Sequence, residues 1–182
     1  ALRRAAQAAA RKNDGTAVAG GWADIGGSIT CTGTSCSPLP NAANGLTNVA
    51  DISCGGYACV VRKTDGKAYA WGRTTSGGDP GGVDLTNVAD ISCGPQGRVC
   101  VARKNDGTAY AWGEDYTGGD PGGVDLTNVA DISCGHQACV ARKYDGTAVA
   151  WGYDEVLAVS ICKRRGCVHP CVYTQKNPYL RQ

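Results

Sequence analysis

The segment LTNVADISCGHQACVARKYDGTAVAWG, residues 126–152, decides the fold, because close copies of it occur three times in the chain. Its opening, LTNVADISCG, starts at Leu46, Leu85 and Leu126, so the copies begin 39 and 41 residues apart. Each copy continues to an RK-x-DG turn and a final AWG. Repetition at this period is typical of architectures in which each unit packs against the next.

Three β-strands joined by turns are predicted within each copy. In the first copy they cover residues 49–54, 58–63 and 67–72. An Asp-Gly pair precedes the third strand of every copy and favours a tight hairpin, because glycine tolerates a positive φ. Gly-Pro linkers separate the copies, and a short fourth strand is expected at 83–85.

The third strand indicates how the copies pack. Its residues alternate between two faces, with Ala68 and Ala70 on one face and Tyr69 and Trp71 on the other. Neither face is polar, so we expect both faces to be buried. Small residues of one copy would then receive large residues of the next, and one copy cannot bury its own Trp.

The chain divides into four regions. Residues 11–21 repeat the back half of a copy, with Gly20 in the place of the Trp, and the Ala-rich residues 1–12 predict a short helix. The regions expected are an N-terminal segment at 1–10, a half repeat with an inserted loop at 11–45, three tandem β repeats at 46–152, and an irregular Cys-rich tail at 153–182.

Three submotifs recur in order over residues 46–152, namely V-A-D-I-S-C-G, then H-Q-A-C-V-A-R-K, then D-G-T-A-V-A-W-G. Together they resemble the repeat of the regulator of chromosome condensation family, and the resemblance implies blades of a seven-bladed propeller. The short spacing is closer to the compact propellers of the β-lactamase-inhibitor type.

Three and a half copies do not close a seven-bladed ring, which casts doubt on functions that need a closed propeller, including nucleotide exchange. The expected fold is therefore all-β, with tandem three- to four-stranded β-blades in a partial or open propeller-like array. A short N-terminal helix and an irregular Cys-rich tail would flank this array. Its end blades should expose faces that something else covers.

The amino-acid composition limits the classes of partner and indicates where the stability of the fold comes from. A net charge of +2 argues against nucleic acid as the main partner, and no run approaches the roughly 18 apolar residues of a membrane span. The chain has no Phe or Met, and only 29 of its 182 residues are Leu, Ile or Val. Such a thin aliphatic core needs further bracing, for which the eleven cysteines are the obvious source.

Eight cysteines form pairs that are separated by the length of a short hairpin turn. Facing positions across a hairpin can meet disulfide geometry, although the alternative of small buried thiols stays open. We favour disulfides, and with them an oxidising, non-cytosolic compartment such as an organelle lumen or the secreted space. The expected pairs are Cys31/Cys36, Cys54/Cys59, Cys93/Cys100 and Cys134/Cys139.

The remaining cysteines lie in the tail. Cys162, Cys167 and Cys171, with His169 between the last two, offer a donor set that tetrahedral zinc accepts. The single-residue gaps around His169 are tight for one ion, so one disulfide plus a free thiol is favoured over a metal. No cofactor is expected.

Charged residues recur once in every copy. Arg62, Arg103 and Arg142 would align as a basic stripe that could face an acidic partner or a lipid surface, with solvated turn residues as the alternative. The strand residues Asp51, Asp90 and Asp131 are expected to pair with them.

No catalytic motif stands out, and the near-identity of the copies argues for structure over catalysis. The leading hypothesis is a non-enzymatic interaction module, acting as an accessory or stabilising subunit of a larger assembly. A membrane-associated organellar complex, such as a photosynthetic one, would be an example, and a homodimer is an alternative means of covering the ends. The other hypotheses are a soluble propeller-type binder or inhibitor, and a metal- or redox-active protein working through the tail.

Overall fold

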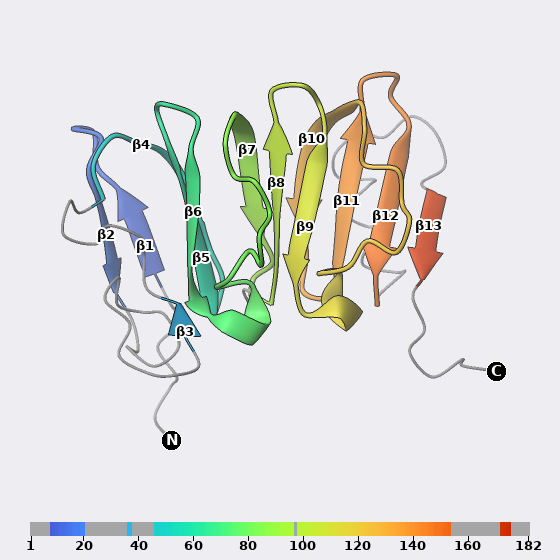
Figure 1. Cartoon of the computed structure of the whole chain (residues 1–182), viewed down its shortest axis with the longest axis horizontal. Coiled ribbons are helices and arrows are strands. Elements are labelled where there is room, and N and C mark those ends of the chain that lie inside the picture. The colour runs from blue at the N-terminus through green and yellow to red at the C-terminus, as the bar shows by residue number, and fades with distance from the viewer. Residues whose placement is uncertain (1–7, 21–35, 38–45, 97, 154–171, 176–182) are drawn as a thin grey trace.

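The computed structural model describes residues 8–20, 36–37, 46–96, 98–153 and 172–175 of the chain. These residues form four small β-sheets that follow one another side by side in sequence order (Figure 1). Each sheet is one blade of an open array. The expected all-β class and the tandem, propeller-like arrangement are therefore confirmed, and we number the blades 1 to 4 from the N-terminus.

Each blade is built from antiparallel neighbours, with an outer strand added in two of them. Blade 1 contains β1 (Ala8–Arg11) and β2 (Ala17–Gly20). Blade 2 contains β4 (Val49–Cys54), β5 (Ala58–Lys63) and β6 (Ala68–Arg73), with β3 (Cys36–Ser37) paired to β6. Blade 3 contains β7 (Val88–Cys93), β8 (Val99–Lys104) and β9 (Ala109–Gly113). Blade 4 contains β10 (Val129–Cys134), β11 (Ala138–Lys143) and β12 (Ala148–Gly152), with β13 (Val172–Gln175) parallel to β12.

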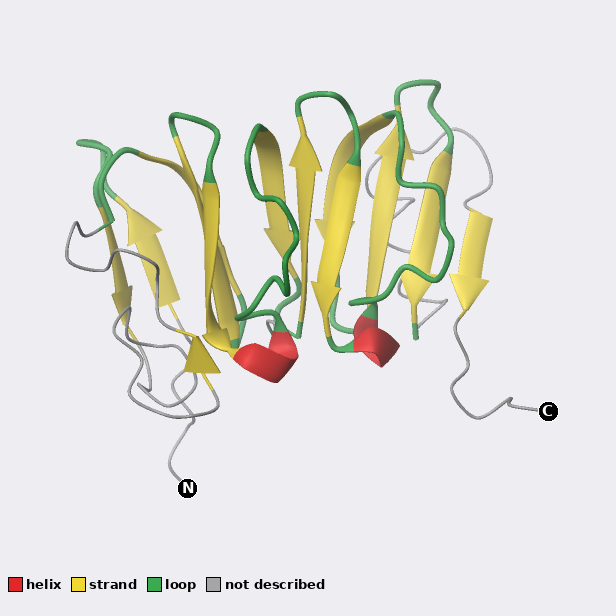
Figure 2. Cartoon of the chain, viewed as in Figure 1, coloured by secondary structure: helices red, strands yellow, loops and turns green. Residues whose placement is uncertain are grey.

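The strands give the array two distinct ends. The Asp-Gly turns lie at the upper end in Figure 1. The first hairpin turns of blades 2, 3 and 4 lie at the lower end, together with the single 3₁₀ turns η3 (Thr74–Ser76) and η4 (Asp115–Thr117), which are red in Figure 2.

Two local predictions were wrong. The Ala-rich N-terminal segment is not helical over Ala8–Arg11, which form β1. Pairing with β2 satisfies the backbone of these residues and outweighs the helix propensity of alanine. The linker residues 83–85 form no fourth strand, because the carbonyl of Leu85 instead accepts the N–H of Ala68 from the preceding blade at 2.8 Å.

Backbone hydrogen bonds join each blade to the next. Besides the bond from Ala68 to Leu85, the N–H of Val88 donates to the carbonyl of Gly66 at 2.8 Å. The two other junctions repeat this arrangement, with Ala17 N–H to Leu46 O, Val49 N–H to Gly15 O, Ala109 N–H to Leu126 O and Val129 N–H to Gly107 O. The repeated Leu-Thr-Asn-Val segment is therefore the connection between blades.

The repeated tryptophan fills the space between neighbouring blades, as the sequence predicts. Trp112 is 5% exposed and packs in one cluster with Ala58, Val60, Ala68 and Ala70 of blade 2. The third strand is not fully buried on the face that carries the tryptophan, because Tyr110 keeps 42% of its surface exposed. Burial of a large side chain against small residues of the preceding copy thus supplies most of each junction.

The indole N–H groups of the tryptophans differ between copies. Trp112 donates to the carbonyl of Gly77 and Trp151 to that of Gly118, both at 2.9 Å and both across a blade junction. Trp71 is fully buried, yet its Nε1 has no hydrogen-bond partner among the described residues. The position equivalent to Gly77 in the half repeat falls within 21–35, outside the described residues.

Three disulfides close the first hairpins of blades 2, 3 and 4, as the spacing of the cysteines suggests. They are Cys54–Cys59, Cys93–Cys100 and Cys134–Cys139. Their sulfur atoms also pack between blades, since Cys93 and Cys100 belong to the same cluster as Trp112. Cys31 lies outside the described residues, so its pairing with Cys36 stays a prediction.

The side of blade 4 that faces away from blade 3 is not an open apolar surface. Ala138, Val140, Ala148 and Ala150 occupy the positions that receive the next blade in blades 2 and 3, and none is more than 2% exposed. Among the described residues, the face that was expected to be exposed at this end of the array is therefore buried.

Replacing tryptophan by phenylalanine at two equivalent positions isolates the indole hydrogen bond. Trp112→Phe leaves the buried carbonyl of Gly77 without its donor, whereas Trp71→Phe breaks no such bond. We expect Trp112→Phe to lower the free energy of unfolding by about 1–3 kcal/mol more than Trp71→Phe does. Urea denaturation of both variants measures the difference, and equal losses would contradict the structure.

Alkylation without a reductant tests the disulfides. Mass spectrometry should find the six hairpin cysteines unmodified in the denatured chain, and modified after reduction. Each reduced pair should cost about 2 kcal/mol on the chain-entropy model. Four or more alkylated hairpin thiols before reduction would refute the pairing.

Candidate functional site

The copies differ most at the lower end of the array. LTNVADISCG is identical in all three copies, but the first hairpin turns read Gly-Gly-Tyr at 55–57, Gly-Pro-Gln-Gly-Arg at 94–98 and Gly-His-Gln at 135–137. The residue after AWG also changes, from Arg73 to Glu114 to Tyr153. We call the contacting side chains at this end of blades 2 and 3 the rim cluster, which consists of Tyr57, Arg73, Ser76, Arg98, Glu114 and Tyr116.

A regular backbone frame holds these variable residues. The N–H of Arg73 donates to the carbonyl of Tyr57 at 2.8 Å, and the N–H of Glu114 donates to the carbonyl of Arg98 at 2.8 Å. The N–H of Gly56 in blade 2 donates to the carbonyl of Pro95 in blade 3 at 3.0 Å. The lower turns of neighbouring blades are therefore tied directly to each other.

Close backbone approaches leave this frame little freedom. Gly113 has a φ of 121°, and a Cβ added there would lie 2.1 Å from the carbonyl oxygen of Arg98. A Cβ on Gly94 would lie 2.5 Å from the carbonyl oxygen of Gly135 in the next blade. Only glycine fits at either position, so the frame presents its side chains in fixed places.

A hydrogen-bonded network forms the blade 3 side of the rim cluster. Nη1 of Arg98 donates to Oε2 of Glu114 at 3.0 Å and to the hydroxyl of Tyr116 at 2.6 Å. The hydroxyl of Ser76, from blade 2, donates to Oε1 of Glu114 at 2.7 Å. The Glu114 carboxylate, 16% exposed, is thus bound from two blades at once.

Charge within the network is balanced. Its hydrogen bond to Glu114 raises the pKa of Tyr116 above its usual value, with burial and the charge of Glu114 acting in the same direction. Burial acts against the Arg98 cation, but Glu114 and the two nearby tyrosines outweigh it, so the pKa of Arg98 is also raised. Tyr116 is therefore neutral at neutral pH, with its hydroxyl accepting a hydrogen bond from the Arg98 cation.

Tyr57 carries two guanidinium groups on its ring. The Cζ of Arg73 lies 5.2 Å from the ring centroid, and the Cζ of Arg98 lies 5.6 Å from it. Both distances are within the range of cation–π attraction. Because Arg73 belongs to blade 2 and Arg98 to blade 3, the ring links the basic side chains of two copies.

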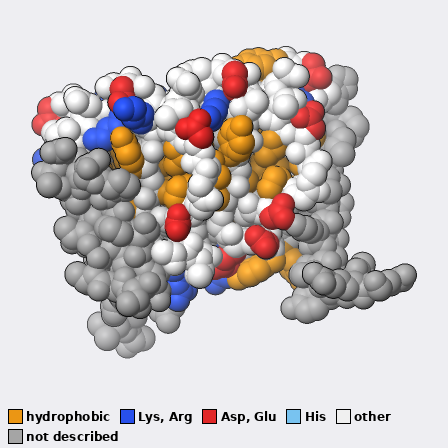
Figure 3. All heavy atoms as spheres, viewed as in Figure 1, with side chains coloured by type: hydrophobic (Ala, Val, Ile, Leu, Met, Phe, Trp, Pro, Cys, Tyr) orange, Lys and Arg blue, Asp and Glu red, His pale blue; other side chains and the backbone are white. Residues whose placement is uncertain are grey.

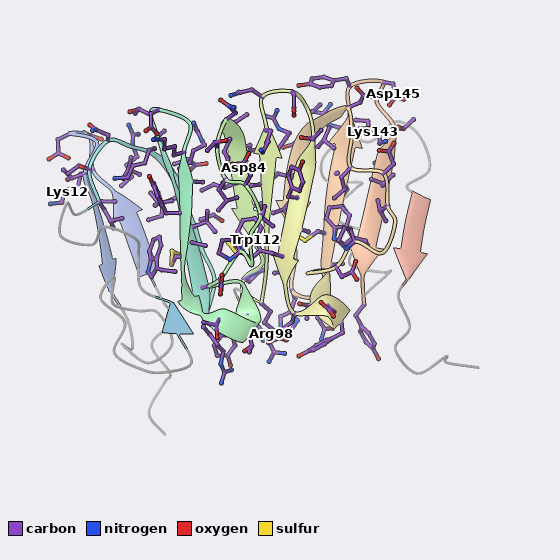
Figure 4. All side chains as sticks on the ribbon, in the orientation of Figure 1. Lys12, Asp84, Arg98, Trp112, Lys143 and Asp145 are labelled. Carbon is purple, nitrogen blue, oxygen red and sulfur yellow. A yellow bond between two sulfur atoms is a disulfide. The ribbon has the colours of Figure 1, made fainter. Side chains whose placement is uncertain are left out.

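Charged side chains are arranged differently at the two ends of the array. At the upper end, Lys104 pairs with Asp84 at 2.6 Å and Lys143 with Asp125 at 2.5 Å. Figure 4 labels Asp84 and Lys143 in the upper part of the array and Arg98 at its lower end. The Lys104 ammonium and the hydroxyl of Thr86 lower the pKa of Asp84 to about 2. At the lower edge, side chains of both signs and hydrophobic side chains meet on the surface (Figure 3).

The structure separates Arg62, Arg103 and Arg142, the predicted partner-facing arginines, from the rim cluster. They are half-buried near the upper ends of the middle strands, where each lies opposite the expected aspartate in register: Asp51, Asp90 and Asp131. Nε of both Arg62 and Arg103 is buried without a hydrogen-bond partner.

For Asp51 and Asp90, the carboxylate also accepts a hydrogen bond from its own strand. Oδ1 of Asp51 accepts the N–H of Ile52 at 2.8 Å, and Oδ1 of Asp90 accepts that of Ile91 at 2.9 Å. Burial raises the pKa of Asp90, and the negative charges of Asp131 and Asp51 raise it further. The N–H of Ile91 and the charge of Arg103 act on this pKa in the opposite direction but do not cancel the rise. This aspartate column is a structural feature of the blade wall.

The described residues offer no metal site. Within them, no group of three or more His, Cys, Asp or Glu side chains is placed to hold a metal ion. The predicted metal candidates Cys162, Cys167, His169 and Cys171 lie outside the described residues. No helix in the described part of the chain is long and apolar enough to cross a membrane.

Comparison with known proteins identifies the repeats. Residues 49–77 match the family described as "Regulator of chromosome condensation (RCC1) repeat". Prp20p from Saccharomyces cerevisiae has a TM-score of 0.54 at 17% identity, over 80% of this chain and 43% of its own. Human WBSCR16 has a TM-score of 0.52 at 18% identity, over 78% and 44%. The receptor kinase CR4 ectodomain of Physcomitrella patens has a TM-score of 0.51 at 17% identity, over 80% and 36%.

These findings bear out the resemblance seen in the repeated submotifs: residues 49–77 match the RCC1 repeat, and the array shares the fold of β-propeller proteins such as Prp20p. The chain spans less than half of the length of each of the three solved structures. No curated protein sequence matches significantly.

Sequence reasoning missed the rim cluster. The submotifs draw attention to what the copies share, whereas the rim residues are those that differ at equivalent positions. The signal was the changing residue after AWG and the two extra residues in the turn between Cys93 and Cys100.

Two aspartates should respond to pH in opposite directions. The folded-state pKa of Asp90 is raised by burial, so its charge opposes folding above its unfolded pKa of about 3.8, and Asp90→Asn should stabilise the chain at pH 7 but not at pH 3. The pKa of Asp106 is lowered by hydrogen bonds from Thr108, so Asp106→Asn should destabilise at pH 7, and this loss should disappear on acidification.

Unfolding midpoints of both variants and the parent chain at several pH values measure these effects. Destabilisation by Asp90→Asn at pH 7 would show that Arg103 stabilises the Asp90 charge by more than its burial costs.

Proposed function

We propose that this chain is a non-enzymatic protein–protein interaction module, acting as an accessory or stabilising subunit of a larger assembly. The observation that carries the proposal is the contrast between blade strands that are nearly alike in the three copies and a lower rim whose residues differ. Selection for packing alone would keep the equivalent positions alike. Instead, Tyr57, Arg98 and Gln137 replace one another at a single structural position.

The composition of the rim supports protein recognition. Tyrosine and arginine dominate binding hot spots, because they combine a large contact area with directional hydrogen bonds. Tyr116 and Tyr153 are 44% and 49% exposed at the lower end. The fixed glycine frame reduces the entropy lost on binding.

Related folds give this proposal a precedent. Two structures with this fold are titled by their partners: Kap60 bound to yeast RCC1 (Prp20), and Prp20p with its binding properties to Gsp1p and histones. RCC1-like repeats thus suggest a protein-interaction role. The three disulfides are compatible with an oxidising compartment, such as an organelle lumen or the secreted space. An organellar membrane complex, for example a photosynthetic one, is the kind of assembly that we propose.

One observation favours a second candidate function. The buried side of blade 4 means that this end of the array does not need a partner to cover it. A self-standing soluble binder or inhibitor that uses the same rim is therefore the alternative. Light scattering on the purified chain separates the two functions, because a stable monomer without a native assembly favours the binder.

Matched pairs of exposed tyrosines test the proposed surface. Tyr116→Ala with Tyr153→Ala removes aromatic area at the lower end, and Tyr110→Ala with Tyr144→Ala removes a comparable area elsewhere. We expect the first double variant to lose about tenfold or more in retention of the native partner, and the second to retain it.

Affinity purification from the native source, quantified by mass spectrometry, gives the retention. Tyr153→Ala alone is the further control, because its side chain takes no part in the Arg98–Glu114 network, which stays intact. Equal retention by both double variants would place the contact surface elsewhere.

A further inference from the structure

The two arginines on the ring of Tyr57 differ in how their charge is balanced. Arg98 has Glu114 at 3.0 Å and the hydroxyl of Tyr116 at 2.6 Å. In the described part of the chain, Arg73 has no carboxylate within ion-pair distance, and the ring of Tyr57 is its recorded side-chain contact. The rim cluster thus contains one compensated guanidinium and one uncompensated guanidinium.

The guanidinium of Arg73 is held where it can bind an anion. The Tyr57 ring restrains the Arg73 side chain before anything binds, and the hydrogen bond from Arg73 N–H to the carbonyl of Tyr57 fixes the Arg73 backbone. The planar guanidinium presents paired donors that match a carboxylate, and a restrained fork loses less entropy on forming those bonds. The nearby charge of Arg98 also makes an added negative charge favourable, since it would offset the repulsion between two adjacent cations.

The other rim residues indicate which chemical groups should lie next to that carboxylate. On the blade 3 side, Arg98 balances the charge of Glu114, and the exposed Asp115 adds one negative charge. Tyr116 and Tyr153 instead offer exposed aromatic surface toward blade 4. The rim therefore changes along its length from a free cation, through a balanced network, to aromatic side chains.

We infer that Arg73, held on Tyr57, is the docking point for a carboxylate on an acidic peptide segment of the protein partner. The segment lies along the rim with its acidic residue at blade 2 and its apolar part over Tyr116 and Tyr153. This inference rests on the proposed function, and it names the chemistry that the partner must carry.

A short oligoglutamate peptide with a fluorescent label is the probe, and the oligoglutamine peptide of equal length is its neutral counterpart. We expect the full oxidised chain to bind oligoglutamate at least about fivefold more tightly, with an affinity that falls as NaCl rises. Arg73→Ala should weaken oligoglutamate binding by about tenfold, and Arg73→Lys should keep part of it.

Lys67→Ala is the matched control, because it removes one exposed positive charge at the opposite end. It should bind as the parent chain does. Tyr57→Leu is the second variant, and it should weaken binding by freeing the Arg73 side chain while leaving the charge in place. Circular dichroism and the thiol count confirm that each variant is folded.

Three results would overturn the inference. They are equal binding of the two peptides, unchanged binding by Arg73→Ala, and an equal loss with Lys67→Ala, which would indicate net charge alone. Native-partner retention by Arg73→Ala is measured in parallel. If the partner is retained while oligoglutamate discrimination is absent, the docking chemistry fails and the proposed function stands. If no partner depends on the lower end at all, the proposed function fails as well.

Discussion

Burial of the repeated tryptophan against the small residues of the preceding copy is the interaction on which the rest of the structure depends. Trp112 and Trp151 each fill one junction and donate a hydrogen bond across it. A blade of three short strands with alanine and valine on one face has no core of its own. The chain contains no Phe or Met to supply one, so the neighbouring copy must.

The sequence allowed the junctions to be predicted, because their residues recur at a fixed period. Alternation in AYAWG placed the tryptophan, and hairpin spacing paired the cysteines. The helix predicted near the N-terminus was wrong over Ala8–Arg11, because pairing with β2 overrides the helix propensity of alanine. The rim cluster was out of reach because it joins Ser76 to Glu114, 38 residues apart, through turns whose geometry no propensity describes.

Stability and the proposed recognition are therefore carried by different parts of each copy. The wall repeats, since every junction meets the same packing requirement, and the upper ion pairs such as Lys104–Asp84 repeat with it. The lower turns are bounded by the same glycines but present Tyr57, Arg98 or Gln137. The frame thus tolerates substitution of the side chains that it displays, and the surface can diversify without loss of the fold.

Native-state hydrogen exchange tests the central claim, that the blades are stable only through their neighbours. The amides of Ala68, Val88, Ala109 and Val129 donate between blades, while those within the β4–β5 and β7–β8 ladders donate inside one blade. The account predicts that both groups exchange with the same free energy of opening. Fast exchange between blades with persistent protection inside them would show that each blade is stable alone, and would contradict the account.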